Sequence, residues 1–100
     1  MKILLVCCAG MSTGILMKKM EAYWANQGED LKIDAVSVNE YEDVCQDYDI
    51  VLVGPQISYR LDEIRTGSGK PCAAINATDY ALHNCAKIMQ LARGLYQELA

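Results

Sequence analysis

Apolar and polar positions along the 100-residue chain alternate between runs typical of buried strands and spacings typical of helices. Residues 2–7 and 49–53 are almost entirely apolar, as in the central strands of a parallel sheet that is buried on both faces. Residues 31–38 alternate apolar and polar side chains, which predicts a strand at the edge of the sheet with one wetter face. A shorter apolar run over residues 71–75 predicts a fourth strand.

The segments between these strands carry helical spacing. Over residues 12–28, Leu16, Met20 and Tyr23 share one face, and Gly28 suits a helix end. Shorter helices are predicted over residues 39–47 and 57–65. A final helix is predicted from a cap at Thr78 or Asp79 to Leu99. One face of that helix carries Leu82, Cys85, Met89, Ala92, Tyr96 and Leu99.

Four strands interleaved with helices predict an α/β fold, a three-layer sandwich with a four-stranded parallel sheet flanked by helices. It should be doubly wound, like flavodoxin or the tyrosine phosphatases of low molecular weight. Such folds bind ligands at the carboxyl ends of strands, where the strand order reverses. We therefore expect residues 7–14 and 54–59, which follow the two most buried strands, to converge on one site. Residues 1–100 match the size of a single domain.

Composition narrows the classes of function. Hydrophobic residues make up 52% of the chain and charged residues 22%, which predicts a packed core. A net charge of −4 without a basic run argues against nucleic acid as a partner. No segment approaches the roughly 20 apolar residues of a membrane span. With one histidine and no C-x-x-C pair, no metal site is expected. Cys45, Cys72 and Cys85 are interpreted as buried packing residues.

The segment that follows the first strand carries the candidate chemistry. Cys7 ends the strand, and a helix begins a few residues later. The start of a helix offers backbone N–H groups and a positive dipole to an anion, and the same field favours a thiolate. We therefore predict that Cys7 is a nucleophile inside a phosphate cradle. The cradle consists of Cys8, Ala9, Gly10, Met11, Ser12, Thr13 and Gly14.

Some of these residues also have simpler interpretations. The hydroxyls of Ser12 and Thr13 could bind phosphate or only cap the helix. Gly10 could allow close approach of the backbone or form a plain turn. The segment contains neither a Walker A lysine nor a G-x-G-x-x-G fingerprint. Tyrosine phosphatases of low molecular weight have an arginine six positions after the cysteine, where this chain has Thr13. Without that guanidinium clamp, the segment favours a carrier over a phosphatase.

Two motifs together resemble the IIB component of the bacterial phosphotransferase system (PTS), lactose/cellobiose and chitobiose class. They are Cys7-Cys8-Ala9-Gly10-Met11-Ser12-Thr13 and Asp49-x-Val51-Leu52-x-Gly54-Pro55-Gln56-Ile57-x-Tyr59. The resemblance implies that Cys7 accepts a phosphoryl group from a histidine of a IIA component. It implies that Cys7 then passes the group to a sugar held by the membrane permease IIC. The sugar would be of the β-glucoside (cellobiose), chitobiose or lactose type.

The resemblance also implies a cytoplasmic protein that needs no cofactor and does not insert into the membrane. It would reach the inner face of the membrane only transiently, through IIC. A carrier that docks two partners in turn with one face is expected to be a monomer. Gln56 and Tyr59 either line the site or contact IIA, or else only shape their loop. The role of Cys8, a position often occupied by serine in this family, stays open.

Two other classes of function compete with the carrier. One is a small cysteine-dependent phosphatase or thiol reductase on the same fold. A reductase needs a resolving cysteine, and a disulfide between the adjacent Cys7 and Cys8 would be strained. The other is a non-enzymatic module that binds phosphate, in which a nucleophilic cysteine would have no purpose.

Overall fold

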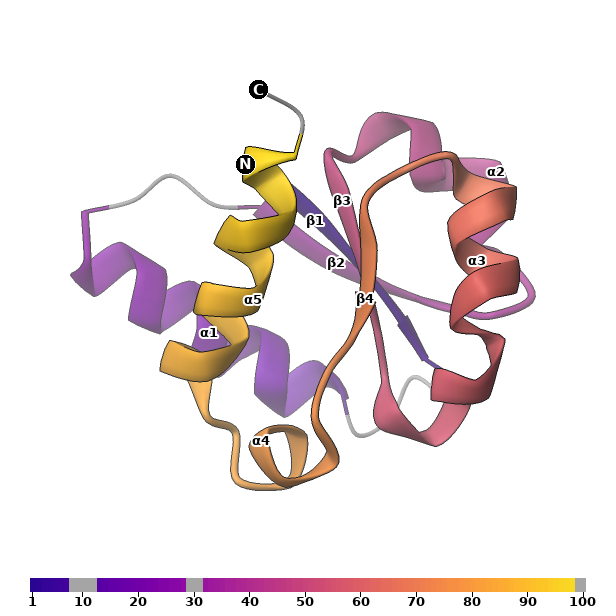
Figure 1. Cartoon of the computed structure of the whole chain (residues 1–100). Coiled ribbons are helices and arrows are strands. Elements are labelled where there is room, and N and C mark those ends of the chain that lie inside the picture. The colour runs from indigo at the N-terminus through magenta and orange to yellow at the C-terminus, as the bar shows by residue number, and fades with distance from the viewer. Residues whose placement is uncertain (8–12, 29–31, 99–100) are drawn as a thin grey trace.

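Four parallel strands form the centre of the computed structural model, which describes residues 1–7, 13–28 and 32–98 (Figure 1). The strands are β1 (Lys2–Cys7), β2 (Lys32–Ser37), β3 (Ile50–Val53) and β4 (Cys72–Ala74). Their order across the sheet is β2-β1-β3-β4, so the strand order reverses between β1 and β3. This order confirms the predicted parallel α/β sheet and the edge position of β2.

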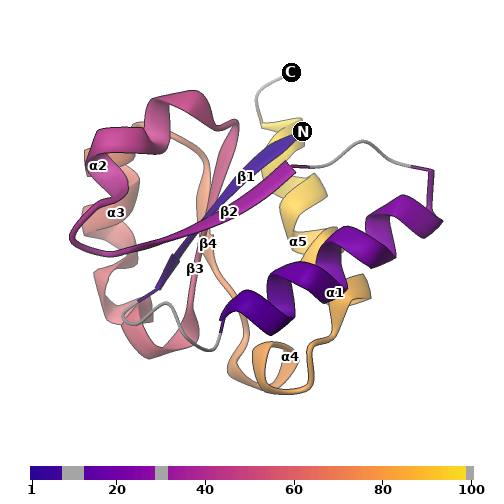
Figure 2. The same cartoon turned by 180° about the vertical axis from the view of Figure 1, so that it is seen from behind.

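Helices cover both faces of the sheet (Figures 1 and 2). One face carries α1 (Thr13–Asn26) and α5 (Cys85–Gln97), and the other carries α2 (Tyr41–Val44) and α3 (Leu61–Ser68). The remaining short elements are the 3-10 turns η1 (Cys45–Asp47) and η2 (Pro55–Arg60) and the helix α4 (Ala77–Ala81). The result is the predicted three-layer sandwich. In the described part of the chain, no helix has the length and hydropathy that crossing a bilayer requires.

The core consists of two clusters, one on each side of the sheet. Alternate side chains of a strand point to opposite faces. Ile3 and Leu5 therefore pack beneath α1 and α5, whereas Leu4 and Val6 pack beneath α2 and α3, and all four are 0% exposed. This burial on both faces explains why β1 reads as a continuous apolar run.

Helix α1 contacts the sheet through residues spaced four apart. Leu16, Met20 and Trp24 are buried, whereas Tyr23 is only half-buried. The prediction for Leu16 and Met20 is therefore confirmed. Trp24 is the largest fully buried side chain of the molecule as described, and it continues this row one turn beyond Met20.

The prediction of one long final helix is wrong, because the chain breaks between α4 and α5. Residues 82–84 form the turn, and His83 has a left-handed backbone with φ 52°. The side-chain oxygen of Asn84 then accepts a hydrogen bond from the Lys87 backbone N–H at 3.3 Å and caps α5. The break also exposes Leu82, which is 72% accessible and does not belong to the core.

The predicted caps of this region are also wrong. Asn76 caps α4, because its side-chain oxygen accepts from the backbone N–H groups of Thr78 (2.8 Å) and Asp79 (3.3 Å). Asparagine is a strong N-cap residue, and an N-cap side chain usually accepts from the backbone N–H groups two or three residues later, as it does here. Cys85 packs against the core but is only half-buried, so it is not the buried residue that was predicted. Tyr96, on the predicted apolar face, is 44% exposed. Leu99 lies outside the described residues.

The other elements differ from the predictions mainly at their ends. The predicted helix over residues 57–65 is the turn η2 followed by α3, which continues to Ser68. Gly69 ends α3 with a left-handed φ of 68°, a conformation that glycine adopts without steric cost. The acidic segment over residues 39–47 contains α2 and η1, and β4 is shorter than predicted.

Candidate functional site

The carboxyl ends of β1 and β3 lie side by side, at the point where the strand order reverses. Val6 pairs with Val53, and the Gly54 backbone N–H donates to the Val6 carbonyl at 2.9 Å. This ladder brings Cys7, the last residue of β1, next to Gly54, the first residue after β3. Two segments that are far apart in the sequence therefore meet at one edge of the sheet.

Cys7 is held firmly at this edge. The Val38 backbone N–H donates to its carbonyl at 2.9 Å, and its Sγ lies 3.6 Å from the Val36 carbonyl oxygen. The residue is only 2% exposed. The alternation along β1 that turns Ile3 and Leu5 toward α1 places Cys7 on that same face of the sheet. The thiol therefore lies at the carboxyl end of β1, on the sheet face that α1 covers.

The helix that follows Cys7 in the chain begins at Thr13. Its first turn contains no acidic residue, so no side-chain carboxylate in that turn offsets the positive end of the helix dipole. Position 14 does not need glycine to avoid a steric clash, because a Cβ added there would meet nothing within 4 Å. The other predicted cradle residues lie outside the described residues, namely Cys8, Ala9, Gly10, Met11 and Ser12.

Gly54 belongs to the segment 54–59 that was expected to meet residues 7–14, but the sequence assigned it no role of its own. A Cβ at this position would lie 3.8 Å from the Cβ of Cys7, 3.6 Å from the Val6 carbonyl oxygen and 3.2 Å from Oε1 of Gln56. Its φ of −62° is open to any residue, so glycine leaves space here and does not supply a special backbone conformation. A glycine directly after a buried strand was the available signal.

Gln56 and Tyr59 both lie in η2, but they occupy different surroundings. Oε1 of Gln56 lies 3.2 Å from the point where a Cβ of residue 54 would be. The exposed side chain of Gln56 therefore lies close to Gly54, the neighbour of Cys7. Tyr59 is 82% exposed, whereas Ile57 between them is buried and anchors the turn. Gln56 is therefore placed near the candidate site, and Tyr59 presents its ring to solvent.

The two arginines that follow β3 are bound to carboxylates. Arg60 donates two hydrogen bonds to Glu63, at 2.8 and 3.0 Å, and this pairing raises the pKa of the guanidinium. Arg65 donates to Asp62 at 3.0 Å and to the Cys72 carbonyl at 3.2 Å. Neither side chain therefore supplies the free guanidinium that a phosphatase clamp requires.

Burial raises the pKa of two thiols elsewhere in the fold, which makes them weaker nucleophiles at neutral pH. Burial raises the pKa of Cys72 to about 11, so this thiol stays protonated at neutral pH. Burial also raises the pKa of the half-buried Cys85 thiol. Cys45 is 1% exposed, and its Sγ lies 3.8 Å from the Glu42 carbonyl oxygen. Cys45 and Cys72 are thus the buried packing residues that were predicted.

Residues 2–91 match the sequence model of a family described as the PTS system, Lactose/Cellobiose specific IIB subunit. The chain is 31% identical to the cellobiose-specific EIIB component of Lactococcus lactis subsp. lactis (strain IL1403), over 93% of this chain and 94% of that relative. It is 41% identical to the oligo-beta-mannoside-specific EIIB component of Bacillus subtilis (strain 168). That alignment spans 64 residues, which is 64% of this chain and 62% of the relative.

Two solved structures share the fold. The solution structure of a cellobiose-specific phosphotransferase IIB component from Borrelia burgdorferi superposes with a TM-score of 0.82 at 37% identity. The superposition covers 98% of this chain and 93% of that chain. The lactose-specific IIB component domain from Streptococcus pneumoniae gives a TM-score of 0.83 over 96% of this chain and 97% of that chain. At 16% identity, this second likeness concerns the fold alone.

Proposed function

The chain belongs to the family of lactose/cellobiose-specific IIB subunits of the phosphotransferase system, and on this premise we propose that Cys7 carries the phosphoryl group. As a member of this family, the protein is a phosphotransferase that carries phosphoryl groups for sugar uptake of the cellobiose/lactose type. The observation that supports Cys7 is its position. It ends β1 beside the reversal of strand order, on the sheet face that α1 covers.

The first transfer forms a phosphorus–sulfur bond. The Cys7 thiolate attacks the phosphorus of a phosphohistidine on the IIA component, in line with the phosphorus–nitrogen bond. That bond breaks, and its electron pair returns to the histidine ring nitrogen, which later takes up a proton. Backbone N–H groups of the cradle, which runs from Cys8 to Gly14, stabilise charge on the equatorial oxygens.

The second transfer reverses this geometry. A hydroxyl of the sugar bound by IIC attacks the same phosphorus, and the phosphorus–sulfur bond breaks to restore the Cys7 thiolate. The hydroxyl proton goes to a base that we assign to IIC. The family implies both partners, IIA and IIC.

Three features favour a carrier over a phosphatase. Cys7 is only 2% exposed, whereas an enzyme that hydrolyses a phosphocysteine must admit water to the phosphorus on the side opposite the sulfur. Thr13 stands where a phosphatase has arginine, and Arg60 is bound to Glu63. Because Sγ is buried, the docking of a partner must also open access to it.

We further propose the setting in which the carrier works. It is a monomer of one domain, residues 1–100, which acts in the cytoplasm and meets the membrane only through IIC. The two named relatives are described as specific for cellobiose and for oligo-beta-mannosides. A sugar of the β-glucoside or lactose type fits this group.

Intact-protein mass spectrometry tests the assignment of Cys7. The protein is incubated with phosphoenolpyruvate, enzyme I, the histidine carrier protein and a cognate IIA component. We expect a single phosphoryl adduct that depends on IIA. Cys7→Ser should fold but acquire no adduct, because a serine hydroxyl is a far weaker nucleophile than a thiolate at neutral pH.

Cys45→Ala is the matched control, since it also removes a buried thiol but from a different part of the fold. This variant should still acquire the phosphoryl group. An IIA-dependent adduct on Cys7→Ser would contradict the assignment. Turnover of an aryl phosphate by the wild type, with no adduct from any IIA, would point to the phosphatase instead.

A further inference from the structure

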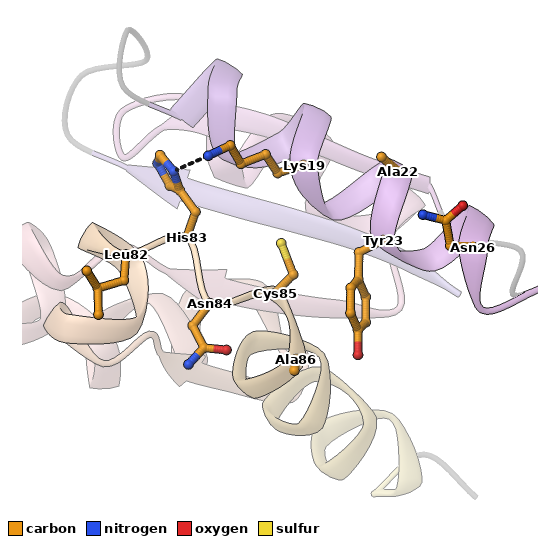
Figure 3. A pocket seen from close by; sticks show the side chains of 9 residues that line it. All are labelled: Lys19, Ala22, Tyr23, Asn26, Leu82, His83, Asn84, Cys85 and Ala86. Atoms are coloured by element: carbon orange, nitrogen blue, oxygen red, sulfur yellow. Dashed lines mark hydrogen bonds between the residues drawn. The ribbon is translucent and has the colours of Figure 1, made fainter.

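An open groove of about 650 Å³ lies between α1 and the turn that joins α4 to α5 (Figure 3). Residues of α1 form one wall, and the turn and the first residues of α5 form the other. Cys7 is not among the described residues that line it, so the groove does not include the proposed nucleophile. The lining residues include Lys19, Ala22, Tyr23, Asn26, His83 and Ala86.

The rim of the groove carries a hydrogen bond between two residues that are 64 positions apart. Nζ of Lys19 lies 3.2 Å from Nδ1 of His83 (Figure 3). An ammonium group only donates, so Nδ1 must accept and the proton of the imidazole sits on Nε2. Lys19 keeps two further N–H donors, and His83 keeps one.

The charge of the groove is unbalanced. The chain has 13 acidic residues against nine lysines and arginines, yet the described residues that line the groove include no aspartate or glutamate. In the described part of the chain, Lys19 forms no salt bridge. The nearby carboxylate of Asp79 instead accepts a hydrogen bond from the Asn84 amide at 3.4 Å. Among the described residues, the ammonium group therefore has no anionic partner.

Other polar groups converge on the same space. Tyr23 and Asn26 line the groove, and neither side chain has a hydrogen-bond partner among the residues that the structure describes. Cys85 begins the 13-residue helix α5, so the positive end of the helix dipole adds to the electric field of the Lys19 ammonium group. Small molecules bind in concave sites of this kind, where a few polar groups surround an apolar floor.

The conformation of His83 is a separate observation at the same place. It is the only described residue other than glycine with a positive φ, at 52°. Residues held in this region are concentrated at binding and catalytic sites. Here the left-handed turn brings the imidazole to Lys19 across the mouth of the groove.

We propose that this groove binds a small oxyanion, the phosphate or carboxylate group of an organic molecule. Lys19 provides the charge, and Nε2–H of His83 and the Asn26 amide donate hydrogen bonds. Tyr23, Ala22 and Ala86 contact the body of the ligand. The site is independent of Cys7 and of the phosphoryl transfer.

Nuclear magnetic resonance of the ¹⁵N-labelled protein tests the proposal. The protein is titrated with sodium phosphate and, separately, with sodium acetate, at ionic strength held constant with sodium chloride. We expect saturable shifts at residues 83–87 with a Kd on the order of millimolar for at least one of the two probes. The two titrations distinguish a phosphate ligand from a carboxylate ligand. Phosphate bound near Cys7 would shift a separate set of resonances.

Lys19→Gln should weaken binding at residues 83–87 by roughly five- to tenfold, since it removes a charge-assisted hydrogen bond. Lys18→Gln is the matched control, because Lys18 is the preceding, exposed residue of the same helix and does not line the groove. His83→Asn should also weaken binding while keeping the fold, because asparagine tolerates a positive φ. Circular dichroism checks the folding of all three variants.

The proposal is wrong if neither probe gives saturable shifts at residues 83–87. Equal weakening in Lys19→Gln and Lys18→Gln would overturn it as well, because that result indicates non-specific attraction to a positive surface.

Discussion

The position of Cys7 depends on contacts with residues that lie far from it in the chain. Backbone groups of Val36 and Val38 contact it on one side, and Gly54 lies on the other. The sequence alone predicts that a thiol ends a buried strand. It does not show that Gly54 leaves space beside that thiol, because this proximity depends on β3 pairing with β1.

Tyr48 gives a test at the scale of single residues. Its hydroxyl donates to the Asp34 carboxylate at 2.7 Å, and this hydrogen bond, together with burial, raises the pKa of Tyr48 to about 12. The folded state therefore holds the phenolic proton more tightly than the unfolded state, where the pKa is about 10. The resulting stabilisation is complete below about pH 10 and is lost as the pH rises to about 12.

Tyr48→Phe should lower the free energy of unfolding by about 0.5–1 kcal/mol at neutral pH, because it removes this hydrogen bond. The difference from the wild type should shrink as the pH rises from about 10 toward 12. Urea unfolding at a series of pH values measures both effects, and Tyr59→Phe, at an 82% exposed position, is the control. A difference from the wild type that stays constant with pH would contradict this account.

At the scale of elements, the end of the chain shows the limit of periodicity. Cys85, Met89 and Ala92 keep helical spacing with Leu82, although a turn over residues 82–84 separates α4 from α5. A break that preserves the phase of the apolar positions cannot be detected from their spacing. Asn76 and Asn84, each just before a helix, were the usable local signals.

The cap of α4 can be tested directly. Asn76→Ala should lower the free energy of unfolding by about 1 kcal/mol, because two backbone N–H groups lose their acceptor. Thr78→Ala should cost much less, since Thr78 contributes only its backbone N–H to this cap. Urea unfolding curves of both variants measure the difference. If Thr78→Ala were the more destabilising substitution, the hydroxyl of Thr78 would be the cap after all.

At the scale of the whole molecule, exposed apolar side chains are concentrated at the carboxyl end of the sheet. Ile15 lies in the first turn of α1, Tyr59 in η2 after β3, and Leu82 at the end of α4, with exposures of 58, 82 and 72%. Tyr96, 44% exposed, lies instead near the far end of α5. Exposed apolar groups around a site commonly mark protein–protein contacts. This end must face both IIA and IIC if Cys7 is the carrier.

Ile15→Glu should therefore slow phosphoryl transfer from IIA by about tenfold when IIA is below saturation, because it places a charge in the proposed contact. Tyr96→Glu makes the same kind of change on the opposite end of the molecule and should leave the rate unchanged. Neither variant should alter the free energy of unfolding much, since both side chains are exposed. Equal slowing in both variants would rule out this docking surface. Initial rates of phosphocysteine formation measure the effect.

The sequence by itself determined the parallel α/β sheet, the order of its elements, the family and the cysteine that ends the first strand. These features follow from local burial patterns and short motifs, which neighbouring residues encode. Only the tertiary structure decided the detailed contacts between distant groups: the space that Gly54 leaves beside Cys7, the hydrogen bond of Tyr48 to Asp34, and that of Lys19 to His83. Such contacts depend on how strands pair and how helices pack on them, and no local pattern records that arrangement.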